Sequence, residues 1–346
     1  MPEFRWRLAA DDGGQGALFE DQVERHVGRG EFRGLEFLHV RARRLINEVP
    51  KASAVPFRWT INAYRGCSHA CRYCFARPTH EYLGMGIGDD FDRRIVVKVN
   101  AVERVRAELA PGRWAGDHIA MGTNTDPYQR CEGKYHLTRG IVEELASAAN
   151  PFSILTKSTL ILRDLDLLAD AAARTGVRAN FSIGTLDEEV WRTSEPGTPH
   201  PMRRVEAVAR LNQAGVPCGV LVAPVLPGLS DSPEQLEAVV KACVEAGARS
   251  ISPLLLHLRP GVREHYLGWL ARVRPDLLDA YGQLYPRAYA PSATQDALAA
   301  LVRDLVVRHG GRTAPPRQAI AAPPARRRRT STPSKSATPR QLGLGV

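Results

Sequence analysis

The 346-residue sequence contains no apolar run long enough to cross a membrane. Its best apolar stretch, residues 219–226, is interrupted by Pro224 and followed by Pro227, whereas a membrane-spanning helix needs about 20 consecutive apolar residues. The first residues lead into acidic and glycine-rich sequence instead of the apolar core of a secretion signal. We therefore expect neither a membrane protein nor a secreted one, and a cytoplasmic, reducing location is the default.

The sequence also lacks any extreme of composition. Hydrophobic residues make up 44% of it and charged residues 24%, as in ordinary globular proteins, which excludes a wholly disordered, collagen-like or coiled-coil chain. The length suits a single α/β barrel with extensions.

The positive charge is concentrated at the end of the chain. Lysine and arginine exceed aspartate and glutamate by 47 to 37, a net charge of +10. Residues 312–346 hold eight basic residues and no acidic one, so the rest of the chain carries only +2 (10 − 8). This basic tail is rich in Pro, Ser, Thr and Ala and is expected to be disordered. It predicts either a weak electrostatic contact with nucleic acid or simply a solvated terminus.

Strand-like apolar runs alternate with segments of helical period between residues 57 and 258, which predicts a parallel sheet built from β-α units. We expect six core strands and one candidate extra strand at residues 95–99. The core strands are expected near residues 59–62, 118–122, 152–156, 178–184, 218–223 and 250–256. Of the helices between them, the last is expected to start with Asp231 or Ser232 as its cap and to end at Gly247.

The expected division of the chain follows from this pattern. The β-α region at 57–258 is preceded by an N-terminal extension at 1–56. It is followed by a helical segment at 259–311 and by the basic tail at 312–346. Because parallel β-α folds gather reactive groups at the C-terminal ends of their strands, candidate site residues are sought there.

Three of the six cysteines, Cys67, Cys71 and Cys74, fall within eight residues directly after the first expected strand. A disulfide is not expected, given the compartment and the odd number in this group. Thiolates on one short loop can each bind a different iron of an iron-sulfur cluster, which leaves one iron open for catalysis. Zinc with His69 or His80 as a fourth ligand is the alternative, although the paired two-residue spacings of structural zinc sites are missing.

The order Cys-x-x-x-Cys-x-aromatic-Cys at the end of the first strand resembles the radical S-adenosylmethionine (SAM) superfamily. Further motifs resemble its spore-photoproduct-lyase-like branch, the DNA repair photolyase type, and the resemblance covers about residues 57–258. These motifs are the segments 122–129, 155–158, 163–164, 182–187, 195–196 and 224–231. The resemblance implies a partial, TIM-like (β/α)6 barrel, open on one side, with a 4Fe-4S cluster on the three cysteines.

The resemblance also implies which residues bind SAM, namely Tyr73, Thr123, Asn124, Thr125, Asp126, Lys157 and Ser182. Lys157 would pair with the carboxylate of the cofactor, Ser182 would bind its ribose or carboxylate, and Tyr73 would lie near the adenine. Residues 123–125 would face the methionine amine. Asp126 is either a ligand or a turn-forming residue before a proline.

Two positions depart from the pattern of the lyase. Matched through the aspartate, Thr123 stands where the lyase has its hydrogen-donor cysteine, and Phe75 replaces a tyrosine. Threonine has no weak S–H bond and phenylalanine no phenol, so photoproduct repair itself is not expected. Cys131, in the loop beyond the second strand, is either a replacement hydrogen donor near the pocket mouth or an incidental surface-loop cysteine. Cys218 and Cys243 are expected to be small buried hydrophobes.

These observations predict a radical SAM enzyme. It would cleave SAM reductively at a 4Fe-4S cluster and use the 5'-deoxyadenosyl radical to abstract hydrogen from an unidentified substrate. An electron donor such as flavodoxin or ferredoxin would be its partner. The alternatives are a nucleic-acid-binding protein with a structural metal site, or a DNA-lesion lyase.

Overall fold

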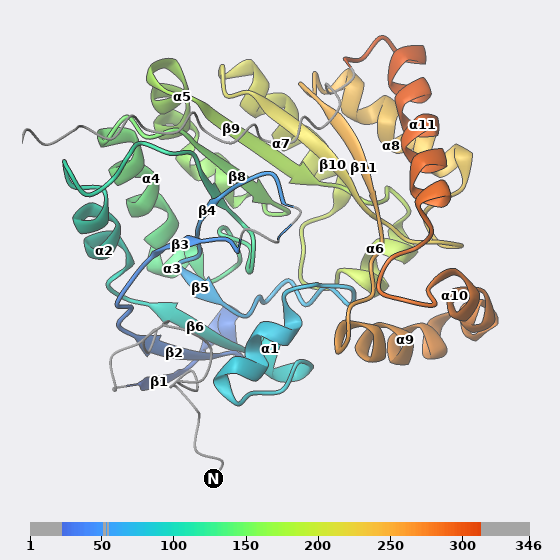
Figure 1. Ribbon diagram of the computed structural model, residues 1–346, viewed down its shortest axis with the longest axis horizontal. Coiled ribbons are helices and arrows are strands. Elements are labelled where there is room, and N and C mark those ends of the chain that lie inside the picture. Colours follow the sequence, from blue (N-terminus) through green and yellow to red (C-terminus); the bar gives the residue numbers. More distant parts are fainter. Residues whose placement is uncertain (1–22, 51–52, 54, 313–346) are drawn as a thin grey trace, which may run out of the picture. The chain divides into compact units, whose positions relative to one another are not determined.

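Six parallel strands form the main sheet of the structure, a computed structural model that describes residues 23–50, 53 and 55–312 (Figure 1). They are β4 (Trp59–Ile61), β7 (Ile119–Met121), β8 (Phe152–Thr156), β9 (Val177–Ser182), β10 (Cys218–Val225) and β11 (Ile251–Leu255). The order is β11-β10-β9-β8-β7-β4, and β3 (Ile46–Glu48) pairs antiparallel with β4 at the edge. All six predicted core strands are confirmed, in an open order that runs from β11 to β3.

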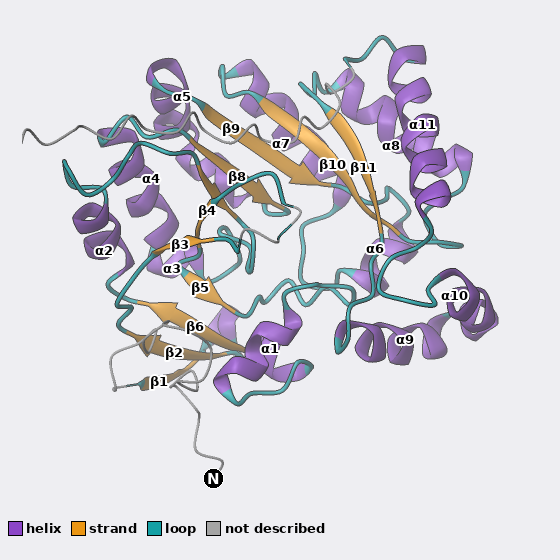
Figure 2. Ribbon diagram, in the orientation of Figure 1, coloured by secondary structure: helices purple, strands orange, loops and turns teal. Residues whose placement is uncertain are grey.

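Helices connect successive strands, as the α/β prediction requires (Figure 2). They are α2 (Ala101–Glu108), α4 (Leu137–Ser147), α5 (Leu165–Arg174), α7 (Pro201–Gln213) and α8 (Pro233–Glu245). Each has apolar residues that are buried in the main core. In α4 these include Leu137, Ile141, Val142 and Leu145. The fold is therefore the predicted α/β architecture with a mostly parallel sheet.

A second, four-stranded sheet was not predicted. Its order is β1-β2-β6-β5, with β1 (Glu24–Val27), β2 (Glu36–Val40), β6 (Arg94–Lys98) and β5 (Tyr64–Arg65). The candidate extra strand at 95–99 belongs to this sheet and not to the main one. Two of its strands and β3 come from the region expected to be an extension. Phe37, Leu38 and Val40 of β2 are buried, so the described part of this region is packed into the fold.

Helices also follow the last strand, in the segment where they were expected. They are α9 (Val262–Val273), α10 (Leu278–Leu284) and α11 (Ser292–Arg308), and α11 packs against β11 and α8. Shorter helices are α1 (Asp89–Arg93), α3 (Glu132–Tyr135) and α6 (Glu188–Ser194), with 3-10 turns at Gly30–Phe32, Arg77–Leu83, Thr159–Asp164 and Pro275–Leu277. Within the described residues, no helix has both the length and the apolar character that crossing a bilayer requires.

Two predictions about the ends of the chain are not tested here. The basic tail lies outside the described residues except for Arg312, and so does most of the first half of the expected extension. The domain boundaries at residues 57, 259 and 312 stay predictions.

The start of α8 is capped by Ser232, one of the two predicted caps. Its hydroxyl accepts a hydrogen bond from the backbone N–H of Gln235 at 3.2 Å, and Pro233 occupies the first turn. Asp231 instead accepts a bond from the N–H of Gly228 at 2.7 Å, within the preceding loop. The helix is followed by Gly247 with φ 73°, a left-handed conformation that suits glycine.

We predict that Ser232→Ala lowers the free energy of unfolding by about 1 kcal/mol, because it removes the side-chain acceptor at the start of α8. Ser232→Asp keeps an acceptor there and is the control. Denaturant unfolding of the three proteins measures the difference. Equal losses in both variants would contradict a capping role.

Candidate active site

A pocket lies at the C-terminal ends of the parallel strands. All of the residues predicted to hold the cluster or SAM line it, which are Cys67, Cys71, Tyr73, Cys74, Thr123, Asn124, Thr125, Asp126, Lys157 and Ser182. The end of β10 and the end of β11 supply an apolar wall that includes Ala223, Pro224, Leu254 and Leu256. One side of the pocket is therefore polar and sulfur-bearing, and the other is apolar.

The cysteines lie on one loop, residues 66–77, called the cysteine loop below. Its start is held by two side chains that follow β7. Thr125 Oγ1 donates a hydrogen bond to the carbonyl of Gly66 at 2.7 Å, and Gln129 Nε2 donates to the same carbonyl at 3.0 Å. The side-chain oxygen of Gln129 accepts from the N–H of Ser68 at 3.0 Å. Thr125 and Gln129 thus position the loop next to Cys67.

Arg77 holds the other end of the cysteine loop. Its fully buried guanidinium donates to the carbonyl of Cys71 at 2.9 Å and to the carbonyls of Ile87 and Gly88, and it pairs with Asp92 at 2.8 Å. Buried arginines are rare unless they are paired in this way. Only the position of Arg77 after the cysteines could have indicated this role.

The middle of the cysteine loop contacts the backbone of the segment that follows α6. The N–H of Gly197 donates to the carbonyl of His69 at 3.0 Å. A Cβ atom at position 197 would lie 2.2 Å from the carbonyl oxygen of Ser68, so the two backbones touch. Next to this contact, Ala70 has φ 53°, a left-handed conformation that non-glycine residues seldom adopt. The surrounding contacts therefore hold the loop in a strained shape.

The three thiols fit an iron-sulfur cluster better than a single zinc ion. Cys67 and Cys71 are buried and Cys74 is partly exposed to the pocket. Among the described residues, no three donors drawn from these cysteines and the nearby histidines lie within 4.8 Å of one another. Sulfur ligands of one tetrahedral zinc must come within about 4 Å of each other, given Zn–S bonds of about 2.3 Å. Thiolates that bind different irons need not approach so closely.

Burial raises the pKa of all three thiols. The positive charge of Lys157 opposes this shift at Cys71 and Cys74. Because metal ligation requires thiolates, binding at this loop must release protons.

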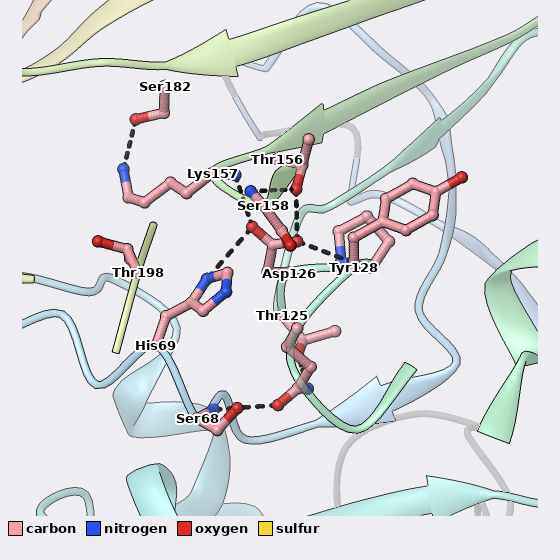
Figure 3. A network of polar contacts seen from close by, with 12 residues as sticks. Ser68, His69, Thr125, Asp126, Tyr128, Thr156, Lys157, Ser158, Ser182 and Thr198 are labelled. Atoms are coloured by element: carbon pink, nitrogen blue, oxygen red, sulfur yellow. Dashed lines mark hydrogen bonds and ion pairs between the residues drawn. The ribbon is translucent and has the colours of Figure 1, made fainter. Parts of the chain in front are cut away.

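Asp126 connects the cysteine loop to the end of β8 (Figure 3). Its carboxylate accepts from Thr156 Oγ1 at 2.6 Å and from the N–H of Lys157 at 2.7 Å, and it lies 3.4 Å from Nδ1 of His69. It also accepts from the N–H of Tyr128 at 2.9 Å, as a turn-forming aspartate does. Burial alone would raise the pKa of Asp126, but His69 and these donors lower it overall.

Thr123 and Asn124 are positioned by Asn62, which sequence reasoning missed. The side chain of Asn62, directly after β4, donates to Thr123 Oγ1 at 3.0 Å and accepts from the N–H of Asn124 at 3.1 Å. Its own carbonyl accepts from the buried ammonium of Lys98 at 2.7 Å. Asn62 therefore ties the end of β4 to the loop after β7.

Lys157 extends from the end of β8 toward the end of β9. Its ammonium donates to Ser182 Oγ, lies 3.4 Å from Glu195 Oε1 and lies 5.5 Å from the centre of the Tyr73 ring. The hydroxyl of Ser182 in turn donates to the carbonyl of Ala223 at 2.6 Å. Lys157, Ser182 and Tyr73, which were all predicted to bind SAM and come from different segments of the chain, are thus next to one another.

Glu195 is the buried centre of this group. Its carboxylate accepts hydrogen bonds from the hydroxyl of Tyr73, from the guanidinium of Arg204 and from Thr198 Oγ1. Burial raises the pKa of Glu195, but Arg204 and Lys157 outweigh this and bring it to about 2. Glu195 belongs to a motif that the resemblance pointed out, yet neither it nor Arg204 was given a role from the sequence.

Cys131 does not belong to the pocket, and the expectation of a surface-loop cysteine near its mouth is wrong. The residue is fully buried in the main core. The reason is the neighbouring Glu132, whose buried carboxylate accepts from Tyr64 and Arg163 and draws the start of α3 inward. Burial raises the pKa of the Cys131 thiol. Cys218 and Cys243 are buried, as expected.

Aromatic residues form part of the pocket rim. Phe75, which is 44% exposed, has its ring centre 6.1 Å from that of His257, and His257 stacks on Tyr289 at 5.4 Å. Both Phe75 and His257 line the pocket.

Comparison of the sequence with known proteins gives a family match. The profile of the Radical SAM superfamily matches residues 61–247. An uncharacterized protein of Mycobacterium tuberculosis is 44% identical over 322 residues, which cover 92% of this chain and 95% of that protein. An uncharacterized protein of Methanocaldococcus jannaschii is 30% identical over 198 residues, which cover 57% of this chain and 70% of that protein.

Comparison of the structure gives a fold match. Spore photoproduct lyase complexed with dinucleoside spore photoproduct has a TM-score of 0.58 at 18% identity, over 80% of this chain and 81% of that chain. A variant of the lyase with bound AdoMet and dinucleoside spore photoproduct has a TM-score of 0.56 at 16% identity, over 80% of each chain. At these identities the likeness shows a common fold.

We predict that Glu195→Gln lowers the free energy of unfolding by about 3 kcal/mol at pH 7, because Arg204 would be left buried without its carboxylate. The folded pKa of Glu195, about 2, lies below its ordinary value of 4.5. Its stabilisation is therefore present above about pH 4.5 and is lost as the pH falls toward 2. The difference between wild type and variant should shrink over that range.

Urea unfolding at several pH values measures this difference. Glu188→Gln is the control, since Glu188 forms an exposed pair with Arg192 and should cost about 0.5 kcal/mol or less. A loss for Glu195→Gln that is as small as the control, or that is independent of pH, would contradict the role of the buried carboxylate.

Proposed function

The chain belongs to the radical SAM superfamily, and on this basis we propose that Cys67, Cys71 and Cys74 hold a 4Fe-4S cluster whose open iron binds SAM. The family match covers more than half of the chain, and as a member the protein is a radical SAM enzyme. The reaction type, the substrate and an electron donor such as flavodoxin or ferredoxin are part of the proposal.

The observation that carries the proposal is the pocket itself. Three thiols from one loop line the same pocket as the ammonium of Lys157 and the hydroxyl of Ser182, which come from the ends of two neighbouring strands. Thiols suit iron, and an ammonium suits a carboxylate. This pairing of a soft-metal site with an amino-acid-binding site is what SAM bound at a cluster requires.

When bound and reduced by the electron donor, the cluster would supply the one electron that cleaves SAM into methionine and a 5'-deoxyadenosyl radical, the species that would abstract hydrogen from the substrate. The residues of the chain orient the reactants. Lys157 would pair with the SAM carboxylate, and Glu195, 3.4 Å from its ammonium, holds this side chain in place. Thr123 and Asn124, fixed by Asn62, face the amine. The apolar wall at the ends of β10 and β11 limits the access of water to the reacting groups.

The substrate is not identified. A DNA-lesion lyase is the alternative that the fold suggests, because the similar lyase structures contain a dinucleoside spore photoproduct. Thr123 and Phe75, which both line the pocket, cannot relay a hydrogen atom as a thiol and a phenol do. Cys131, buried in the core, does not replace them. These residues argue against photoproduct repair.

Anaerobic reconstitution tests the proposal. We expect about four iron and four sulfide ions per chain with a charge-transfer absorption band, and formation of 5'-deoxyadenosine from SAM with a strong reductant. One stably bound zinc ion with no SAM cleavage would instead support a nucleic-acid-binding protein with a structural metal site.

We predict that alanine at any one of Cys67, Cys71 or Cys74 lowers the iron content and abolishes SAM cleavage, because the open-iron arrangement needs all three thiolates. Cys131→Ala and Cys218→Ala remove cysteines of the core and serve as controls that keep the cluster. Iron and sulfide analysis compares them. Full iron content in a variant of the cysteine loop would refute the assignment of that residue.

We predict that Lys157→Ala keeps the cluster but weakens SAM binding at least about tenfold, since a lost charged hydrogen bond costs about 1.5–3 kcal/mol. Lys241→Ala removes an exposed lysine of α8 and is the control. Titration of the reconstituted proteins with SAM gives the dissociation constants. An unchanged constant for Lys157→Ala would remove this residue from the binding site.

A further inference from the structure

Three potential metal ligands lie on one face of the small sheet, away from the cysteine loop in sequence. β1 and β2 pair antiparallel with Glu24 opposite His39, and His26 lies two residues further along β1. Residues two apart on a strand share a face, and directly opposed residues are close neighbours. One donor atom from each of Glu24, His26 and His39 lies within 4.8 Å of the other two, the only such group among the described residues.

We propose that Glu24, His26 and His39 bind a divalent transition-metal ion of the zinc class. Two imidazoles and one carboxylate are donors that zinc and its neighbours prefer, whereas calcium and magnesium take oxygen ligands. With three protein ligands, the fourth position of a tetrahedral ion is filled by water. The site does not depend on the proposed radical chemistry.

The contact of His39 with Tyr135 is an independent observation that supports this proposal. One ring nitrogen of His39, Nε2, is 2.8 Å from the hydroxyl of Tyr135. The ring of Tyr135 packs against Phe37 at 5.5 Å and is thereby fixed at the end of α3. Histidines that bind metals commonly have their second nitrogen held by such a partner, which orients the ring and selects the binding nitrogen. The other nitrogen, Nδ1, would bind the metal.

The remaining two ligands are already associated with His39. His26 Nε2 lies 3.5 Å from Glu24 Oε2, and the rings of His26 and His39 are 4.0 Å apart between centres. Metal–nitrogen bonds of about 2.0–2.1 Å require donors about 3.4 Å apart. The side chains of His26 and Glu24 are 45% and 77% exposed, so they can rotate into that arrangement without disturbing the core.

Charges of both signs lie around the group. On the opposite face of these strands, Arg25 is paired with Glu36 at 2.7 Å. On the side of the ligands, the ammonium of Lys134, 5.4 Å from the centre of the Tyr135 ring, opposes positive charge near His39, whereas the carboxylate of Glu24 favours it. Because β1 is exposed along its whole length, a metal that joins it to β2 would fasten this edge strand and stabilise the folded chain by ligand linkage.

Titration of the full-length, anaerobically reconstituted protein with Zn²⁺, and with Co²⁺ as a spectroscopic probe, tests the proposal. We expect one metal ion per chain beyond the iron and a rise in the melting temperature. The Co²⁺ spectrum should show no thiolate charge-transfer band. His26→Ala, on an exposed side chain that can change without unfolding the chain, should weaken binding at least tenfold, and Glu24→Gln should also weaken it.

His309→Ala is the matched control, because His309 forms a pair with Glu237 at 2.9 Å but belongs to no group of three potential ligands among the residues that the structure describes. It should leave metal binding unchanged. The proposal is overturned if Zn²⁺ does not bind, if His26→Ala binds it as tightly as wild type, or if the Co²⁺ spectrum shows thiolate ligation while the cluster is assembled. Iron and sulfide analysis shows whether the cluster has assembled; if it has not, Co²⁺ can also bind the free cysteine loop, and the comparison of His26→Ala with His309→Ala still tests this site.

Discussion

A carboxylate stays ionised inside a protein only if nearby charges and donors compensate for the loss of water. Glu195 meets this condition with two cations, Arg204 from α7 and Lys157 from the end of β8, and with the hydroxyl of Tyr73 from the cysteine loop. Each partner comes from a different segment of the chain. The contacts that compensate the buried charge of Glu195 therefore fix the position of the cysteine loop relative to the ends of β8 and β9. The pocket forms between the loop and these strand ends.

Features that depend on residues close together in the sequence could be predicted. The six core strands are apolar runs, and each forms where it was expected because a buried parallel strand needs little else. The cysteines are grouped within one loop, so their proximity needed no knowledge of the fold. Lys157 directly follows β8 and Ser182 is the last residue of β9. Because the C-terminal ends of parallel strands meet at one edge, their presence in one pocket was also predictable.

Features that depend on partners far apart in sequence could not be predicted. Gln129 holds Gly66 across 63 residues, and Asn62 holds Thr123 across 61. Nothing local marks these polar side chains as different from solvated ones. The polar sequence around Cys131 suggested a surface loop. However, the charge of Glu132 is neutralised by the distant Arg163, so Glu132 is buried and the neighbouring Cys131 is buried with it. Short strands such as β1 and β2 likewise form only because β6 is there to pair with them.

Because of the contact at Gly197, the residue at this position indicates the shape of the cysteine loop in related proteins. The carbonyl of Ser68 occupies the space in which any side chain at position 197 would begin. A homologue with another residue there must therefore carry a cysteine loop of different shape, however well its cysteine spacing agrees. Position 197 lies more than 120 residues downstream of the cysteines. The residue found there would thus distinguish superfamily sequences with different geometries of this loop, even when their metal-ligand motifs are identical.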